Sequence, residues 1–319
     1  MKFLEHALDK KNQVWKYLLV CLGALVVWPT IGQIPLLIVV LVKAFANGGL
    51  GALNPDNLAD FSYLGLSKNL ALGLVLFSMA VSLVLTVLLV KLLHKRTFSE
   101  VINGRKKIRV ERCLTGAGVW FVIMLLAYAV DILINREDYI VQFNLSQFIP
   151  LLFIVLIFIP FQTTGEEFLF RGYLAQGLAA WTKRHWVAWL VPSLIFGLMH
   201  IANPEVKEFG FWASMPQYIY FGLFFGLISI LDDGIELAMG LHAANNIFLA
   251  LFATHKSSAL QTDAVLEIVH LNPYKDTLLL VLMSAVAMAY FVWKYKWDFH
   301  ILSRELRVEE PKEALPEEG

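Results

Sequence analysis

The sequence predicts an all-α, polytopic membrane protein with about eight transmembrane helices and both termini in the cytoplasm. Of its 319 residues, 58% are hydrophobic and 16% are charged, whereas soluble domains average roughly 45–50% and 25%. The mean hydropathy is +0.64. Because so few charged side chains could not cover the exterior of a soluble domain, the surplus of apolar residues indicates that lipid surrounds much of the chain. The net charge of +0 excludes an overall basic nucleic-acid-binding protein.

The apolar residues gather into stretches of membrane-spanning length. A transmembrane helix needs about 20 mostly apolar residues, because the hydrocarbon layer is about 30 Å thick and each helical residue rises about 1.5 Å. The first stretch contains Pro29 and Pro35, which predict a kinked or broken helix. Eight stretches reach or approach the required length, near residues 17–42, 69–93, 113–134, 148–170, 186–203, 215–231, 235–254 and 277–297.

The basic residues orient these spans. If the N-terminus is cytoplasmic, the inner segments hold 20 of the 26 lysines and arginines and the outer segments hold six. Cytoplasmic loops retain positive charge, so the distribution favours an even number of spans with both ends inside. The basic stretch 94–112 is interpreted as an inner loop near anionic headgroups, not as a nucleic-acid site. Asp232 and Asp233 fall in a short inner turn, where solvated side chains are expected.

The chain divides into three predicted regions. Residues 1–112 form an N-terminal two-span region that ends in the basic loop. Residues 113–300 form the core that carries the polar residues discussed next. Residues 301–319 form an acidic, proline-containing tail that we expect to be disordered.

Ionisable residues inside the spans single out the fourth, fifth and seventh stretches. Each such group costs about 2.5–3.5 kcal/mol at membrane depth, so its presence requires a reason. Glu167 and Arg171 are four residues apart and can pair on one helical face. Glu166 lies about 100° around the helix, so its carboxylate is free for another role. Alternatively, both carboxylates extend to water at the inner interface, in which case they have no catalytic role.

Histidine and asparagine complete this polar set. His200 ends the fifth span, and His242 precedes Asn246 by four residues on one face of the seventh. Asn245 is the alternative to Asn246 as the asparagine that acts together with His242. A histidine in an apolar helix is commonly only a packing residue, and His200 is predicted at the outer end of its span, at a different depth from Glu166. A tilted or re-entrant fifth helix would remove this mismatch.

A glutamate that activates water, together with histidine and asparagine that polarise a carbonyl or bind a metal, can hydrolyse an amide in a sequestered site. Other intramembrane protease signatures are absent from the sequence. It contains no H-E-x-x-H zinc helix, no G-x-S-G serine motif and no G-x-G-D motif.

Three ordered motifs carry a family resemblance. EEFLFR at 166–171, FGLMH at 196–200 and HAANN at 242–246 resemble the EExxxR, FxxxH and HxxxN motifs of the CPBP intramembrane proteases. That family, also described as intramembrane metalloproteases, includes type II CAAX prenyl endopeptidases and bacteriocin-processing or Abi-like immunity proteins. The resemblance covers roughly residues 150–255.

The resemblance implies roles for the matched residues. Glu166 would activate water, His200 would position it, and His242 with Asn246 would form an oxyanion hole. Glu167, Arg171, Phe196 and Asn245 would support them. No cofactor is certain. Zinc is the alternative cofactor, and Glu166, His200 and His242 would be its ligands.

The expected function is cleavage of a peptide bond in a membrane-associated or lipidated protein or peptide. Membrane lipid and such a substrate are the expected partners, with no nucleic acid, and a prokaryotic cell membrane is the expected location. Two alternatives remain. A non-catalytic immunity or scaffold protein could keep the same fold, and a small transporter could use glutamate and histidine as a proton relay.

Overall fold

The computed structural model of the protein describes residues 3–8, 12–54 and 61–307. Its helices, in chain order, are α1 (Val14–Val27), α2 (Ile34–Ala46), α3 (Lys68–His94), α4 (Phe98–Asn103), α5 (Val110–Ile134), α6 (Leu145–Glu167), α7 (Ala175–Thr182), α8 (His185–Leu198), α9 (Pro204–Phe209), α10 (Phe211–Leu231), α11 (Glu236–Phe252) and α12 (Pro273–Tyr295). Three short strands, β1 (Tyr139–Val141), β2 (Ala253–Thr254) and β3 (Leu266–Ile268), form a sheet in the order β1-β3-β2. The predicted all-α class is confirmed.

Each predicted span falls in a helical segment. Within the described residues, six of these segments are long and apolar enough to cross a membrane. The segments near 186–203 and 235–254 are shorter, since α8 has 14 residues and α11 has 17. α11 is mostly buried between neighbouring helices, where a helix need not match the full thickness of the hydrocarbon layer, whereas α8 keeps an exposed apolar face that includes Leu194 and Leu198.

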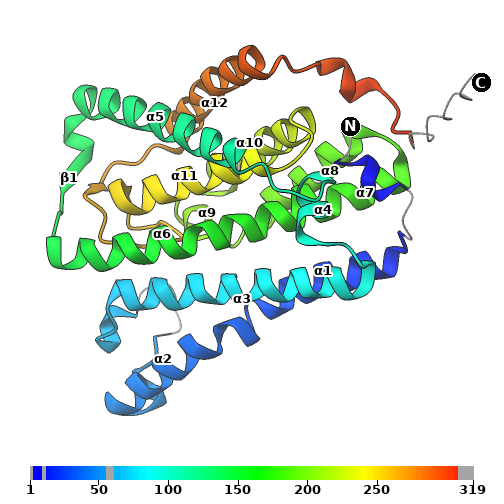
Figure 1. The fold of residues 1–319 in the computed structure, drawn as a ribbon. Helices are drawn as coiled ribbons and strands as arrows, with labels where there is room; N and C mark the ends of the chain where they lie inside the picture. The colour runs from blue at the N-terminus through cyan, green and yellow to red at the C-terminus, as the bar shows by residue number, and fades with distance from the viewer. Residues whose placement is uncertain (1–2, 9–11, 55–60, 308–319) are drawn as a thin grey trace, which may run out of the picture.

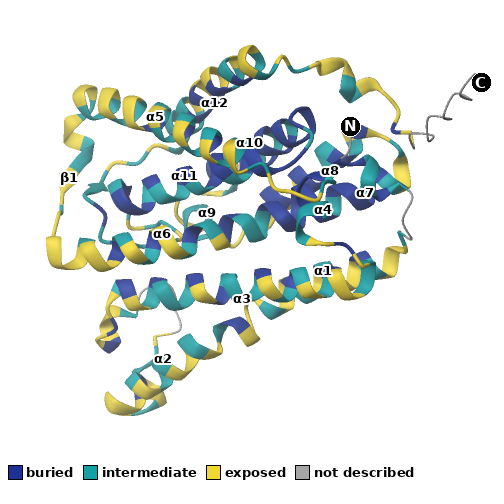
Figure 2. Ribbon diagram, viewed as in Figure 1, coloured by how far each residue is buried: buried dark blue, intermediate teal, exposed yellow. Residues whose placement is uncertain are grey.

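The helices are arranged around α11 (Figure 1). This helix packs between α5 and α6, and α3 lies along the other side of α6 with α1 and α2 beyond it. Figure 2 shows buried residues concentrated on α7, α10 and α11, while the outer faces of α2, α5 and α6 are exposed. The exposed faces are apolar, as Leu133 at 83% and Ile134 at 73% exposure illustrate. Such faces suit contact with lipid. The protein is an integral membrane protein.

Prolines break the first predicted span, whereas the fourth continues as a helix beyond its predicted limit. As predicted, the first is broken: α1 ends at Val27, and α2 begins at Ile34 with Pro35 in its first turn. The fourth apolar stretch was predicted to reach about residue 170. After α6, a π-helical turn (Phe168–Leu174) leads directly into α7, so one helical segment runs from residue 145 to 182. Glu166 therefore lies within a continuous helical segment.

The segments predicted to be cytoplasmic meet at one end of the bundle. The backbone N–H of Phe3 donates to Asp233 Oδ1 at 3.0 Å. The backbone N–H of Leu306 donates to the carbonyl of Lys183, also at 3.0 Å. The first residues of the predicted tail thus pack against the bundle, and residues 308–319 lie outside the described residues. The N-terminal segment and the start of the tail thus lie at the same end of the bundle, which agrees with the predicted even number of membrane crossings.

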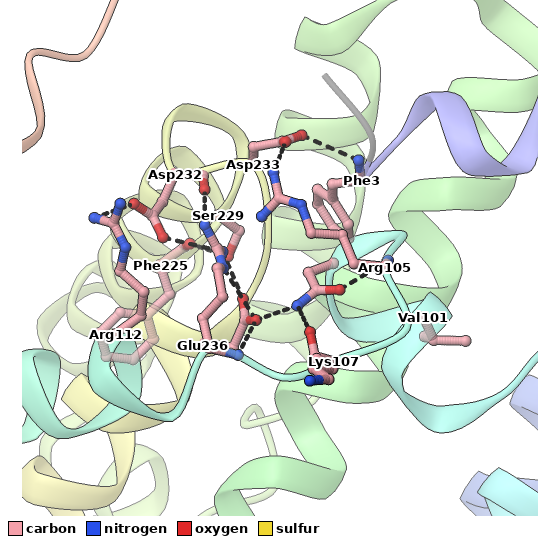
Figure 3. Close-up of polar contacts among 12 residues, drawn as sticks. Phe3, Val101, Arg105, Lys107, Arg112, Phe225, Ser229, Asp232, Asp233 and Glu236 are labelled. Carbon is pink, nitrogen blue, oxygen red and sulfur yellow. Dashed lines mark hydrogen bonds and ion pairs between the residues drawn. The ribbon is translucent and has the colours of Figure 1, made fainter.

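The turn between α10 and α11 is held by arginines of the basic 94–112 stretch (Figure 3). Asp232 contacts Arg112 at 3.0 Å and Arg109 at 3.1 Å, and Asp233 contacts Arg105 at 2.6 Å. The prediction that Asp232 is solvated is wrong, since only 4% of it is exposed. Burial raises the pKa of Asp232 to about 6, because desolvation outweighs the two arginines. The basic loop is therefore also a structural clamp on this turn.

Glycines allow α5 and α11 to pack backbone against backbone. A Cβ on Gly240 would lie 2.0 Å from the carbonyl oxygen of Cys113, and one on Gly116 would lie 2.5 Å from that of Leu237. Only glycine fits these positions without moving a helix. The close approach matters because α11 carries His242 and both asparagines.

Gly240→Ala is expected to lower the free energy of unfolding by about 3 kcal/mol, because overpacking of a tight interface costs at least 1–3 kcal/mol. The measurement is thermal unfolding in detergent. Gly118→Ala on α5 is the matched control, since its Cβ would meet no heavy atom within 4 Å. The control should be neutral or stabilised by up to about 1 kcal/mol. Equal melting temperatures for the two variants would show that the close approach is not required.

Candidate active site

A cavity of about 590 Å³ lies between α1, α3, α6, α8, α10 and α11. Six of the eight predicted site residues line it: Glu166, Phe196, His200, His242, Asn245 and Asn246. The other two, Glu167 and Arg171, lie behind the wall and are fully buried. Residues from three spans far apart in sequence are thus brought to one cavity, as the motif order predicts.

The buried pair behind the wall connects three elements. Glu167 Oε1 accepts from Arg171 Nη1 at 2.9 Å and contacts His242 Nδ1 at 2.8 Å. The Arg171 guanidinium also stacks on the Phe196 ring at 3.9 Å and donates to the carbonyl of Gly222 on α10 at 3.3 Å. The i,i+4 pairing predicted from the sequence is confirmed, although Arg171 lies in the π-helical turn. Such turns are frequent at functional sites because they re-aim side chains.

Glu166 points elsewhere, as its offset on the helix predicts. Its side chain is 26% exposed, and its Oε2 lies 3.7 Å from His242 Nε2. Its Oε1 accepts from Gln162 Nε2 at 2.5 Å. One carboxylate oxygen is therefore held by an amide, and the other faces a histidine beside the cavity.

The protons of both histidines are fixed by their neighbours. His200 Nδ1 lies 2.9 Å from the carbonyl oxygen of Phe196, and His242 Nδ1 contacts the Glu167 carboxylate. Because both partners can only accept, each histidine carries a proton on Nδ1. In the neutral form, Nε2 of each ring is left as an acceptor. The His200 ring also stacks on Tyr218, with centroids 4.4 Å apart.

His200 and Glu166, which were predicted at different depths, line the same cavity. His200 follows α8, which ends at Leu198 after 14 residues. The end of this short helix thus places His200 beside a cavity that Glu166 also lines.

The two asparagines take part in one set of hydrogen bonds. Asn245 accepts from the indole N–H of Trp120 at 3.2 Å and donates to Asn246 at 3.1 Å. Asn246 donates to Gln162 Oε1 at 3.0 Å. Sequence reasoning missed Gln162 and Trp120. Gln162 precedes Glu166 by four residues, a same-face spacing that could have revealed it, whereas nothing local in the sequence connects Trp120 to the site.

By donor type, Glu166 and the two Nε2 atoms suit zinc. By position they do not fit, because no group of three His, Cys, Asp or Glu side chains in the described part of the chain is placed to hold a metal ion. The described residues therefore do not form a preassembled zinc site.

With this geometry in view, comparison with known proteins identifies the family. Residues 146–248 match the family model described as type II CAAX prenyl endopeptidase Rce1-like. The chain is also 31% identical over 297 residues to the uncharacterized protein YyaK of Bacillus subtilis (strain 168), covering 91% of this chain and 95% of the relative. The chain belongs to the Rce1-like family of type II CAAX prenyl endopeptidases. No solved structure matches it.

The resemblance inferred from the three motifs is thus confirmed. All eight predicted site residues and Gln162 lie inside the matched stretch, and Trp120 lies outside it. The family supports a CAAX-type intramembrane protease fold for this chain.

Arg171→Met is expected to lower the free energy of unfolding by about 3–5 kcal/mol, because Glu167 would keep a buried charge without its partner. Thermal unfolding in detergent measures the loss. Arg304→Met is the matched control, since the Arg304–Asp298 pair is 64% and 47% exposed and exposed pairs contribute about 0–1 kcal/mol. If Arg171→Met and Arg304→Met had the same melting temperature, the buried pair would not be a structural requirement.

Proposed function

We propose that this protein is an intramembrane endopeptidase that hydrolyses a peptide bond of a membrane-associated or lipidated protein or peptide. The observation that carries the proposal is the placement of Glu166. It is the member of the carboxylate pair that lines the cavity, with Oε2 3.7 Å from His242 Nε2, while Glu167 is neutralised behind the wall.

In the proposed reaction, Glu166 accepts a proton from a water molecule as the water oxygen attacks the carbonyl carbon of the substrate. The unprotonated Nε2 of His242 accepts a hydrogen bond from the second hydrogen of the same water. His200 positions this water from the other side of the cavity. These residues supply general-base catalysis, which contributes about 10²–10⁴-fold.

The amide of Asn246 supplies a donor for the oxyanion that forms on the carbonyl oxygen. When this intermediate collapses, the carbon–nitrogen bond breaks and the departing amine takes the proton from Glu166. His242 was expected to share the oxyanion role. Its Nδ1 proton is directed to Glu167, so in the neutral form it supports the water instead, and Asn246 is the donor.

An apolar, membrane-embedded substrate suits the cavity wall. Leu25, Trp28 and Met199 all line the cavity and are between 37% and 44% exposed. Between α1 and the end of α8, the cavity is therefore bordered by exposed apolar side chains, on a surface where lipid is expected. The Bacillus relative favours a prokaryotic cell membrane as the location.

Glu166→Gln is expected to reduce cleavage about 10²–10⁴-fold, because an amide cannot take the proton. The membrane and secreted peptides of a knockout strain would be compared after complementation with the wild type, Glu166→Gln, or Glu305→Gln as an exposed-carboxylate control. Cleavage products that the wild type restores in the knockout strain should not be restored by Glu166→Gln. Equal rescue by Glu166→Gln would support the non-catalytic alternative. Loss of wild-type cleavage with a chelator, restored by zinc, would show that a metal is required.

The charge of the cavity makes a separate prediction about the substrate. Among the described residues that line it are three carboxylates (Glu166, Glu205 and Asp276) and three histidines, but no lysine or arginine. A free C-terminal carboxylate would find no cation there. We therefore expect a C-terminally amidated substrate peptide to be cleaved at least as fast as the free acid, in kcat/KM. A tenfold preference for the free acid would contradict this expectation.

A further inference from the structure

Four side-chain hydrogen bonds connect a remote tryptophan to Glu166. The chain of bonds runs from Trp120 on α5 through Asn245 and Asn246 on α11 to Gln162 and Glu166 on α6. Its donor–acceptor distances are, in order, 3.2, 3.1, 3.0 and 2.5 Å. We call these five residues the amide chain.

The amide chain has one permitted direction. An indole N–H can only donate, so Asn245 must turn its oxygen towards Trp120 and its NH₂ towards Asn246. Each following amide is then oriented in the same sense. The last donor meets a carboxylate, which in its ionised form can only accept. Both ends of the chain therefore require the same orientation.

The reversed chain needs a different chemical state. If every amide were flipped, Gln162 would present its oxygen to Glu166, and Glu166 would have to be protonated in order to donate. Asn245 would then present its NH₂ to Trp120, which has no acceptor on its indole nitrogen. Trp120 thus excludes the reversed orientation.

The forward orientation also prepares Asn246. Its oxygen accepts from Asn245, and one of its two N–H groups donates to Gln162. The second N–H takes no part in the chain. Because Asn246 lines the cavity, this second N–H is the group available to an oxyanion.

We propose that Trp120 and Gln162 are positioning residues: through the amide chain they hold the Gln162 amide in the orientation that donates to Glu166 and fix the donor orientation of Asn246. This inference rests on the proposed function. Trp120 is fully buried and is not among the residues that line the cavity, so it acts through the chain and not on the substrate. Gln162 is 6% exposed and touches Glu166 directly.

The test compares two tryptophans. Trp120→Phe removes the donor that starts the chain and keeps an aromatic ring. Trp189→Phe is the matched control, since its indole N–H donates to a backbone carbonyl, that of Leu223, at 2.8 Å and belongs to no part of the chain. The measurement is the rate of cleavage against substrate concentration, giving kcat and KM for the full-length protein in membranes.

For Trp120→Phe we expect kcat to fall about tenfold, with KM within twofold of the wild type. Trp189→Phe should change neither. Gln162→Met should reproduce the effect, and the double variant with Trp120→Phe should be no worse than Gln162→Met alone, because both changes break one chain. Equal kcat values for Trp120→Phe and Trp189→Phe, or additive losses in the double variant, would overturn the proposal.

Asn245→Asp tests whether the direction of the hydrogen bonds in the amide chain matters. The new carboxylate can still accept from Trp120 but cannot donate to Asn246, so a nearly isosteric change should impair kcat as much as Trp120→Phe. Unchanged kcat would contradict a directional chain.

A second readout does not depend on activity. The ¹⁵N-indole NMR signal of Trp120, assigned by its loss in Trp120→Phe, should shift in Gln162→Met while the Trp189 signal stays in place. An unmoved Trp120 signal would overturn the chain. If instead Glu166→Gln retained full cleavage, the proposed function would fail while the NMR result stood, so the two failures are distinguishable.

Discussion

The buried contact between Glu167 and Arg171 is the interaction on which the site depends. Arg171 would be too costly inside the bundle without a counter-charge, and Glu167 supplies it at 2.9 Å. The same carboxylate holds His242 on α11, and the same guanidinium reaches Phe196 on α8 and a carbonyl of α10. One ion pair thereby fixes the relative positions of the elements that carry all three motifs.

Around this pair, helical spacing made much of the site predictable. Glu167 with Arg171 and His242 with Asn246 are each four residues apart, and that geometry is set within a single helix. The apolar stretches likewise predicted the helices and the break near Pro29. The continuation of the fourth helix beyond residue 170 could not be predicted, because Arg171 looks like a residue at a membrane boundary until its partner and its burial are known.

Contacts between distant segments account for what the sequence concealed. Asp232 looks like an ordinary turn residue, yet arginines more than a hundred positions away bury it. Trp120 meets Asn245 only because glycines let α5 and α11 approach within backbone contact. Such pairings depend on how helices pack, and a single sequence contains no local pattern for them. Gln162 is the exception, since its spacing to Glu166 is local and was overlooked.

Two adjacent carboxylates with opposite surroundings are a recurrent way to divide structural and catalytic work. Glu167 has no exposed surface and is matched by a guanidinium and an imidazole. Glu166 is partly exposed, is held by a single amide and faces the cavity. The charged pair can stabilise the fold at any stage of a reaction, because it exchanges no proton with a substrate. The other four residues of the amide chain are neutral, so they can orient Glu166 without competing for the proton that Glu166 must accept.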